Sequence, residues 1–202
     1  IKSLLAKISK DANPLSEIAS RIFQGIITGG DSLFIFEVRS ASESICRVFS
    51  REMNQIVDLE AELVHPFLGG TDIHTYSLDD SSKVILHPYK LQEGNSILLS
   101  EKELMSNYPL AWKYLQSVKS KLQSRGSENM IYPSWYALWN ARDIRLLQSK
   151  KILTQVLAYR ASFSVDSEGV VYFPGGGNAG VYGVTLPEDT KLSLYYIAAL
   201  LN

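Results

Sequence analysis

Short apolar and β-branched segments, separated by polar turns, run along most of this chain and predict a strand-rich protein. Two of these segments, residues 22–27 and 33–38, flank a turn that contains Gly29 and Gly30. Further strands are predicted over residues 45–49, 83–89, 151–157, 161–165, 170–173 and 181–186. Residues 59–64 fit either a strand or a helix.

Helix signals gather in the middle of the chain. Ser100 and Glu103 have the spacing of a capping box, which predicts a helix start at this point. Pro109 suits the first turn of a second helix, whose apolar residues share one face: Leu110, Tyr114, Val118 and Leu122. Gly126 suits the end of that helix, and residues 192–201 predict one more helix.

Together these elements predict an α+β fold, a mixed, strand-rich domain with a central helical segment and short flanking helices. Near the start, Leu4, Leu5 and Ile8 have helical spacing, and Asn13 stands before Pro14, where helical backbone is disfavoured. We therefore expect residues 1–13 to form a linker helix from an absent upstream domain and residues 14–202 to form one domain.

Composition sets the broad class. The 202 residues are 46% hydrophobic and 20% charged, which is typical of a globular protein with a sizeable core. No apolar run reaches the ~18 residues of a membrane-spanning helix, so no membrane partner is predicted. Cys46 is the only cysteine and favours a reducing compartment. Because the chain starts at Ile1 and its last helical pattern stops abruptly, we expect a piece of a longer protein.

The formal net charge of −1 hides an uneven distribution. Residues 110–161 hold nine cations against two anions, and the remainder of the chain is acidic. A basic block within an acidic chain is the electrostatic footprint of a polyanion partner when the fold gathers it on one face. The other interpretation is a solvated helix face on which cations happen to cluster.

Known catalytic motifs are scarce. His65, His74 and His87 lack the spacing of zinc ligands, and no Gly-x-Ser-x-Gly nucleophile motif occurs. Residues 173–177 hold three glycines but precede a strand, which favours a hairpin loop over a phosphate loop at a helix start. A metal-dependent nuclease site could be assembled only from scattered residues: Asp79, Asp80, Glu188, Asp189 and Lys191.

Six short motifs occur in the order of one known family: GIITGGDSLF (25–34), PFLGGTDI (66–73), ILHPY (85–89), YPLAWKYL (108–115), WYAL (135–138) and AALLN (198–202). Residues 15–202 thereby resemble the TaqI-like specificity domain, the C-terminal target-recognition part of adenine-specific DNA methyltransferases and of restriction enzymes fused to them. One departure is Gly70-Thr71, where the family pattern has a basic residue before Asp72-Ile73.

The resemblance implies a division of labour. Adenine methyltransferases carry a catalytic Asn, Asp or Ser followed by Pro-Pro and an aromatic residue, and this chain has no Pro-Pro. We therefore expect no catalytic residues and no cofactor in this chain, with S-adenosylmethionine bound by the parent protein. The expected partners are double-stranded DNA and an upstream methyltransferase domain, with or without a nuclease, in a prokaryotic cytoplasm.

Several side chains are candidates for DNA contacts. If residues 135–142 form a helix, one or two of Trp135, Leu138 and Trp139 belong to the core, whereas Tyr136 and Asn140 lie on another face. Thr28 either holds a phosphate oxygen with the amides of the glycine turn or only closes a hairpin. The full set of predicted DNA-binding residues is Thr28, Lys90, Arg125, Tyr136, Asn140, Arg142, Lys150 and Lys151. The resemblance favours Lys151 as a phosphate contact.

The sequence therefore predicts a DNA target-recognition domain of a restriction–modification protein. Two alternatives remain at this stage, a protein-interaction scaffold and the small metal-dependent nuclease.

Overall fold

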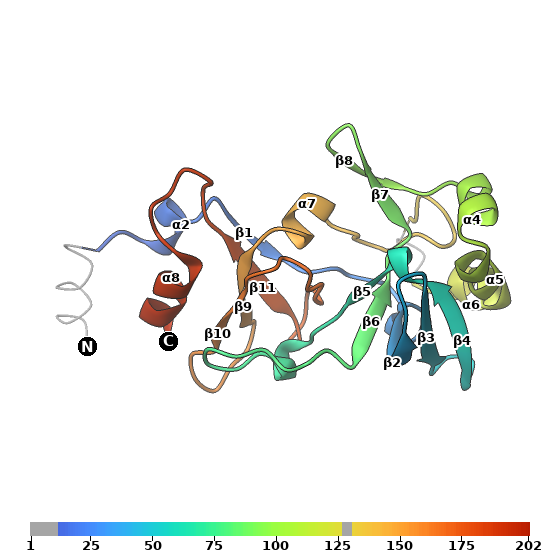
Figure 1. The fold of residues 1–202 in the computed structure, drawn as a ribbon, viewed down its shortest axis with the longest axis horizontal. Helices are drawn as coiled ribbons and strands as arrows, with labels where there is room; N and C mark the ends of the chain where they lie inside the picture. Colours follow the sequence, from blue (N-terminus) through green and yellow to red (C-terminus); the bar gives the residue numbers. More distant parts are fainter. Residues whose placement is uncertain (1–11, 127–130) are drawn as a thin grey trace.

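The structure, a computed structural model, describes residues 12–126 and 131–202 and contains three antiparallel sheets with short helices around them (Figure 1). The α+β prediction is confirmed, including the central helical segment. The predicted linker helix lies outside the described residues except for Ala12 and Asn13, so the division at residue 14 stays a prediction.

A four-stranded sheet occupies the left part of Figure 1, in the order β1 (Arg21–Gln24), β11 (Val181–Thr185), β9 (Lys151–Gln155) and β10 (Phe163–Asp166). Each neighbouring pair is antiparallel. Two helices, α2 (Leu15–Ile18) and α8 (Leu194–Leu201), pack against it and enclose a small core. Four predicted strands and the predicted last helix are thus confirmed here.

A five-stranded sheet lies in the right part of Figure 1, in the order β4 (Gln55–Glu60), β3 (Ile45–Ser50), β2 (Ile35–Ala41), β6 (Lys83–Leu86) and β5 (Val64–Pro66). Residues 59–64, for which the sequence left two readings, end β4, form the 3-10 turn η1 (Ala61–Leu63) and begin β5. Alternate residues of β3, such as Cys46 and Val48, are buried, as expected for a half-buried strand.

The central helices are α4 (Glu101–Asn107), α5 (Pro109–Ser117) and α6 (Lys119–Ser124). The predicted capping box is confirmed, because Ser100 Oγ accepts from the Glu103 amide at 3.2 Å and the Glu103 carboxylate accepts from the Ser100 amide at 2.9 Å. The predicted single helix after Pro109 is divided at Val118, whose backbone has φ −107° and ψ 10°. The predicted apolar face remains largely buried.

Smaller elements lie between these parts. The hairpin β7 (Tyr89–Gln92) and β8 (Asn95–Leu98) forms the third sheet, and α7 (Ile144–Leu147) lies beside it. The Ile144 amide donates to Ser96 Oγ at 2.7 Å, which joins α7 to the hairpin. The remaining short turns are α3 (Asp31–Phe34) and η2 (Gly70–Asp72).

The glycine-rich turn of the sequence does not close a hairpin. β1 before it pairs with β11, whereas β2 after it pairs with β3 and β6, so the two flanking strands belong to different sheets. The turn carries the chain from one sheet to the other. The hairpin interpretation of this segment was therefore wrong, because strand partners come from distant parts of the sequence.

Two glycines mark a close backbone crossing at this connection. A Cβ at Gly25 would overlap the Phe173 carbonyl oxygen, and a Cβ at Gly175 would overlap the Gly25 carbonyl oxygen. Gly175 N also donates to Ile26 O at 2.6 Å. Residues 170–173, predicted as a strand, instead make isolated bridges to neighbouring segments, such as Phe67 with Tyr172. Side chains would not fit where these segments meet.

One large core runs across both main sheets. Phe36 and Ile85 of the five-stranded sheet belong to the same buried cluster as Leu153 and Val181 of the four-stranded sheet. Phe173, which is fully buried, stands at the junction. Among the described residues, no helix has the length and apolar character needed to span a bilayer.

Candidate nucleic-acid interface

Residues 135–142 form turns and one backbone bridge, not a helix. Asn140 pairs with Ile27 in both directions, with Ile27 N to Asn140 O at 3.0 Å and Asn140 N to Ile27 O at 2.8 Å. Arg142 has a φ of 64°, a left-handed conformation that ends the segment before α7. The helical spacing assumed for Tyr136 and Asn140 is therefore wrong.

Tyr136 lies in the core. Its side chain is buried, and its hydroxyl donates to Leu99 O at 2.7 Å. Its ring packs edge-on against Trp112 and Trp135. Of the three residues expected to supply one or two core side chains, Leu138 is buried, Trp135 packs partly buried against the core and Trp139 is half exposed. Burial removes Tyr136 from the set of DNA contacts.

Thr28 closes the glycine-rich turn. Its side chain is buried, its hydroxyl donates to Asp31, and the same oxygen accepts from Gly30 N at 3.0 Å. Both roles of the hydroxyl are used within the turn. Thr28 thus closes a turn between two sheets and not the hairpin that the sequence suggested, and its buried hydroxyl is not accessible to a phosphate.

Arg125 holds three segments together. Its guanidinium donates to the carbonyls of Thr28 and Trp135, each at 3.1 Å, and to the Ala137 carbonyl. It also lies over the Tyr132 ring at 4.1 Å and the Phe34 ring at 5.1 Å. Burial lowers the pKa of this guanidinium from its usual value. Because these contacts use the Arg125 guanidinium to hold the fold together, we no longer count Arg125 among the candidate DNA contacts.

Lys151 is fully buried in the four-stranded sheet. Its ammonium donates to Leu147 O at 2.7 Å, to Ser149 O at 3.1 Å and to Asp166 Oδ2 at 2.6 Å. Burial lowers the pKa of Lys151, and the Asp166 carboxylate opposes that shift. Because the side chain has no exposed surface, Lys151 cannot reach a phosphate in this structure, contrary to its expected role.

Four predicted contact residues keep accessible side chains: Lys90, Asn140, Arg142 and Lys150. Lys90 forms a hydrogen-bonded ion pair with Glu103. The hydrogen bonds that the Glu103 carboxylate accepts from Lys90 and Ser100 lower its pKa to about 2. Arg142 Nε donates to Gly25 O at 2.6 Å. Asn140 and Lys150 are exposed. Asn140, Arg142 and Lys150 are therefore better candidates for DNA contacts than Lys90, whose ammonium is already paired with a carboxylate.

The fold does not gather the basic block of residues 110–161 on one face. Lys121 pairs with Glu52 at the α6 end of the molecule, and Arg145 pairs with Asp143 beside the β7–β8 hairpin. Arg160 lies in the loop between β9 and β10, at the lower edge of Figure 1. The charge pattern alone therefore does not define an interface.

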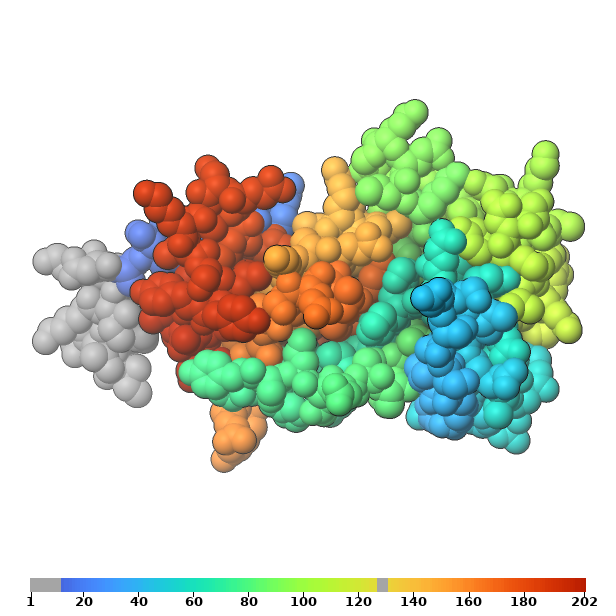
Figure 2. Space-filling model, in the orientation of Figure 1, coloured from blue at the N-terminus to red at the C-terminus, as the bar shows by residue number. Residues whose placement is uncertain are grey.

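Sequence reasoning missed one surface feature, the loop over residues 156–162. This loop, orange in Figure 2, protrudes from the lower edge of the molecule. Tyr159 at its tip is 106% exposed and Leu157 is 60% exposed. The predicted strand over residues 151–157 ends at Gln155 in the structure. The run Leu-Ala-Tyr-Arg between two strands could have indicated an exposed loop, but the sequence prediction assigned its first residue to the strand.

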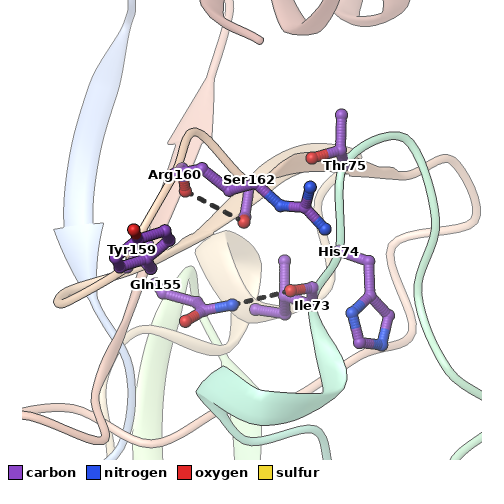
Figure 3. A pocket seen from close by; sticks show the side chains of 8 residues that line it. Ile73, His74, Thr75, Gln155, Tyr159, Arg160 and Ser162 are labelled. Carbon is purple, nitrogen blue, oxygen red and sulfur yellow. Dashed lines mark hydrogen bonds between the residues drawn. The ribbon is translucent and has the colours of Figure 1, made fainter.

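A hollow of about 440 Å³ lies beside this loop (Figure 3). In this view the Arg160 guanidinium extends toward Thr75 and His74, and the Tyr159 ring lies on the opposite side. Gln155 and Ser162 also line the hollow. None of its lining residues carries a carboxylate, although the nearby Asp79 carboxylate accepts from His74 Nε2 at 3.0 Å.

No metal centre forms in the parts of the chain that the structure describes. No three His, Cys, Asp or Glu side chains there gather in a way that could hold a metal ion. The acidic residues of the nuclease alternative are thus not brought together as a cluster. His65 and His87 do lie near each other, but His65 stacks on the Tyr172 ring, with centroids 4.1 Å apart.

The chain is 24% identical over 194 residues to the type II restriction enzyme and methyltransferase RM.Eco57I of Escherichia coli. This similarity covers 91% of the chain but 19% of the relative, so the chain spans about a fifth of that protein's length. No protein-family model matches the chain. The chain is thus distantly related to a restriction–modification enzyme.

Proposed function

We propose that this chain is a TaqI-like specificity domain that recognises duplex DNA and positions it for a catalytic domain elsewhere in its parent protein. The observation that carries the proposal is the similarity to RM.Eco57I along 91% of the chain. A type II restriction enzyme and methyltransferase acts on DNA at defined sequences, and a part without catalytic motifs is suited to reading that sequence.

Methyl transfer, with its S-adenosylmethionine, is assigned in this proposal to a part of the parent protein outside these 202 residues. The chain has no Pro-Pro sequence, which the catalytic motif of adenine methyltransferases requires. The related enzyme is bacterial, which supports a prokaryotic parent protein, and the proposal places that protein in the cytoplasm. The DNA and the catalytic domain are then the two partners of this chain.

The proposed DNA contacts begin near the start of β9. Arg142 and Lys150 flank α7, and Asn140 lies two residues before Arg142. Within the described residues, Lys150 takes part in no ion pair, and Arg142 donates only through Nε. The ammonium and the terminal guanidinium nitrogens are therefore available for phosphate oxygens, and the exposed Asn140 amide is available for a base edge.

The test compares DNA affinities of the 202-residue chain and its variants by fluorescence anisotropy with a labelled 30-base-pair duplex of mixed sequence. The double variant Arg142→Ala with Lys150→Ala should bind about tenfold or more weakly, because two phosphate contacts are lost. Lys113→Ala, which removes an exposed cation of α5, is the matched control and should leave the affinity unchanged.

Thermal unfolding must first show that the double variant keeps the wild-type melting temperature. A folded double variant with wild-type DNA affinity would reject this placement of the interface. A wild-type chain that does not bind DNA even at low salt would reject DNA recognition by this chain.

A further inference from the structure

We propose that the loop over residues 156–162 is a wedge that enters a groove of duplex DNA, where Leu157 and Tyr159 pack against base pairs and Arg160 contacts the adjacent phosphate. This inference rests on the proposed function and adds to it a mode of contact and the residues responsible. Side chains of this kind that enter between base steps unstack them and kink the duplex.

The tip of the loop has no role in the protein core. Tyr159 is 106% exposed and contributes no buried apolar surface to folding, and Leu157 is 60% exposed. Arg160 is also exposed. One loop that protrudes from the molecule thus exposes an aliphatic, an aromatic and a cationic side chain to solvent (Figure 2).

The base of the loop is held firmly while its tip is free. Val156 N donates to Gly180 O at 2.9 Å, and Thr75 Oγ1 donates to Ala161 O at 2.9 Å. Ser162 Oγ donates to Arg160 O at 3.2 Å, as drawn in Figure 3. Because both ends of the loop are fixed, little conformational freedom would be lost when its tip meets a ligand.

The charge around the loop favours a polyanion over a protein partner. The sequence contains no Asp or Glu between Asp143 and Asp166, and the hollow beside the loop is lined by no carboxylate. Tyrosine and arginine together suit nucleic acid, since the ring stacks on a base and the guanidinium pairs with a phosphate. Among the lining residues, Gln155 and Ser162 add polar groups on the same side.

The position of the loop agrees with the contacts proposed near α7. Lys150 precedes the first residue of β9, and the loop follows its last residue, Gln155. A strand of this length spans about 17 Å at ~3.3 Å per residue. The loop and Lys150 therefore lie at opposite ends of β9, and one duplex contacts both when it runs along this strand.

The experiment uses two probes with the 202-residue chain: 30-base-pair duplexes that carry 2-aminopurine at successive positions, and the same duplex labelled at both ends for energy transfer. Wild-type protein should raise 2-aminopurine fluorescence at a subset of positions and bring the ends closer. Tyr159→Ala should abolish both signals and weaken binding about 5- to 100-fold. Tyr159→Phe should retain them, because the ring remains.

Tyr195→Ala is the matched control, since Tyr195 is an exposed tyrosine on α8, and it should behave like the wild type. Arg160→Ala should reduce the salt dependence of binding by about one phosphate contact. If Tyr159→Ala binds as the wild type does, with unchanged 2-aminopurine and energy-transfer signals, the wedge is rejected while DNA recognition stands. If the wild-type chain does not bind DNA, both proposals fall.

Discussion

Two adjacent lysines at the start of β9 have opposite roles. Lys150 is exposed to solvent, whereas Lys151 is fully buried with its ammonium on Asp166 Oδ2. The second carboxylate oxygen of Asp166 accepts from Gly169 N at 2.9 Å and Val170 N at 3.3 Å. The buried charges are thus both paired and hydrogen-bonded, which is the condition under which charges are tolerated in a core.

Removing one member of this pair should be strongly destabilising. Lys151→Met leaves the Asp166 carboxylate buried without its cation, and we expect a loss of about 3–5 kcal/mol in the free energy of unfolding, measured by urea denaturation. Lys150→Met, at the neighbouring exposed position, should change it by less than about 0.5 kcal/mol. Equal effects of the two substitutions would contradict the structural role of Lys151.

Two histidines, the buried His87 and the partly buried His65, should make stability depend on pH. Burial lowers the pKa of His65 to about 4 and that of His87 to about 3, from the usual 6.5. His87 Nε2 donates to the Ala141 carbonyl oxygen, which fixes Nε2 as the protonated nitrogen, and Nδ1 is buried with no partner among the described residues. The folded protein therefore holds both rings neutral.

Below pH 6.5 the unfolded chain binds protons that the folded chain excludes, so the free energy of unfolding falls as the pH decreases toward about 4. The slope should approach 1.4 kcal/mol per pH unit for each histidine. Urea denaturation at pH 7 and pH 5 measures it. His87→Gln should show a shallower dependence, and an unchanged slope would show that His87 does not titrate in this way.

At the scale of elements, local signals were sufficient for some predictions and not for others. The capping box at Ser100 and the helix start at Pro109 depend on neighbouring residues, and both are confirmed. The hairpin considered at Gly29 and the helix assumed over residues 135–142 do not form, because each depends on which distant segment lies alongside. Pairing of Asn140 with Ile27 is an example that no local pattern encodes.

Local sequence patterns were likewise insufficient to predict the contacts of the candidate site. The lysine pair could be read as strand residues that point in opposite directions, but only the packed structure shows that Asp166 lies beside Lys151. Tyr159 and Arg160 carry no periodic signal, since a loop tip has neither helical nor strand spacing. Their exposure becomes evident only when β9 ends at Gln155.

The crossing of residues 25–27 with 173–175 is an element-scale feature that a single methyl group should disturb. Gly175→Ala places a Cβ against the backbone oxygen of Gly25, which cannot move without shifting β1. We expect a loss of about 3 kcal/mol or more in the free energy of unfolding. Gly69→Ala, whose Cβ would meet Asp72 Oδ2 at an ordinary 3.6 Å, is the control and should change stability little.

At the scale of the whole molecule, β9 links the parts proposed to contact DNA. It lies inside the four-stranded sheet, with Lys150 before it and the protruding loop after it. The large core extends through both sheets, with Phe173 buried where they meet. In the proposed function, such a continuous core lets the chain act as a fixed reading surface while chemistry occurs elsewhere in the parent protein.

The central claim, recognition of duplex DNA, is tested most directly by the salt dependence of binding. The affinity of the 202-residue chain for a 30-base-pair duplex would be measured between 50 and 200 mM salt, conditions in which each phosphate contact contributes about 0.9 to the slope. We predict a linear fall of log affinity with log salt and a slope of about −3, from Arg142, Lys150 and Arg160. An affinity that does not change with salt, or no binding at 50 mM, would contradict DNA recognition by this chain.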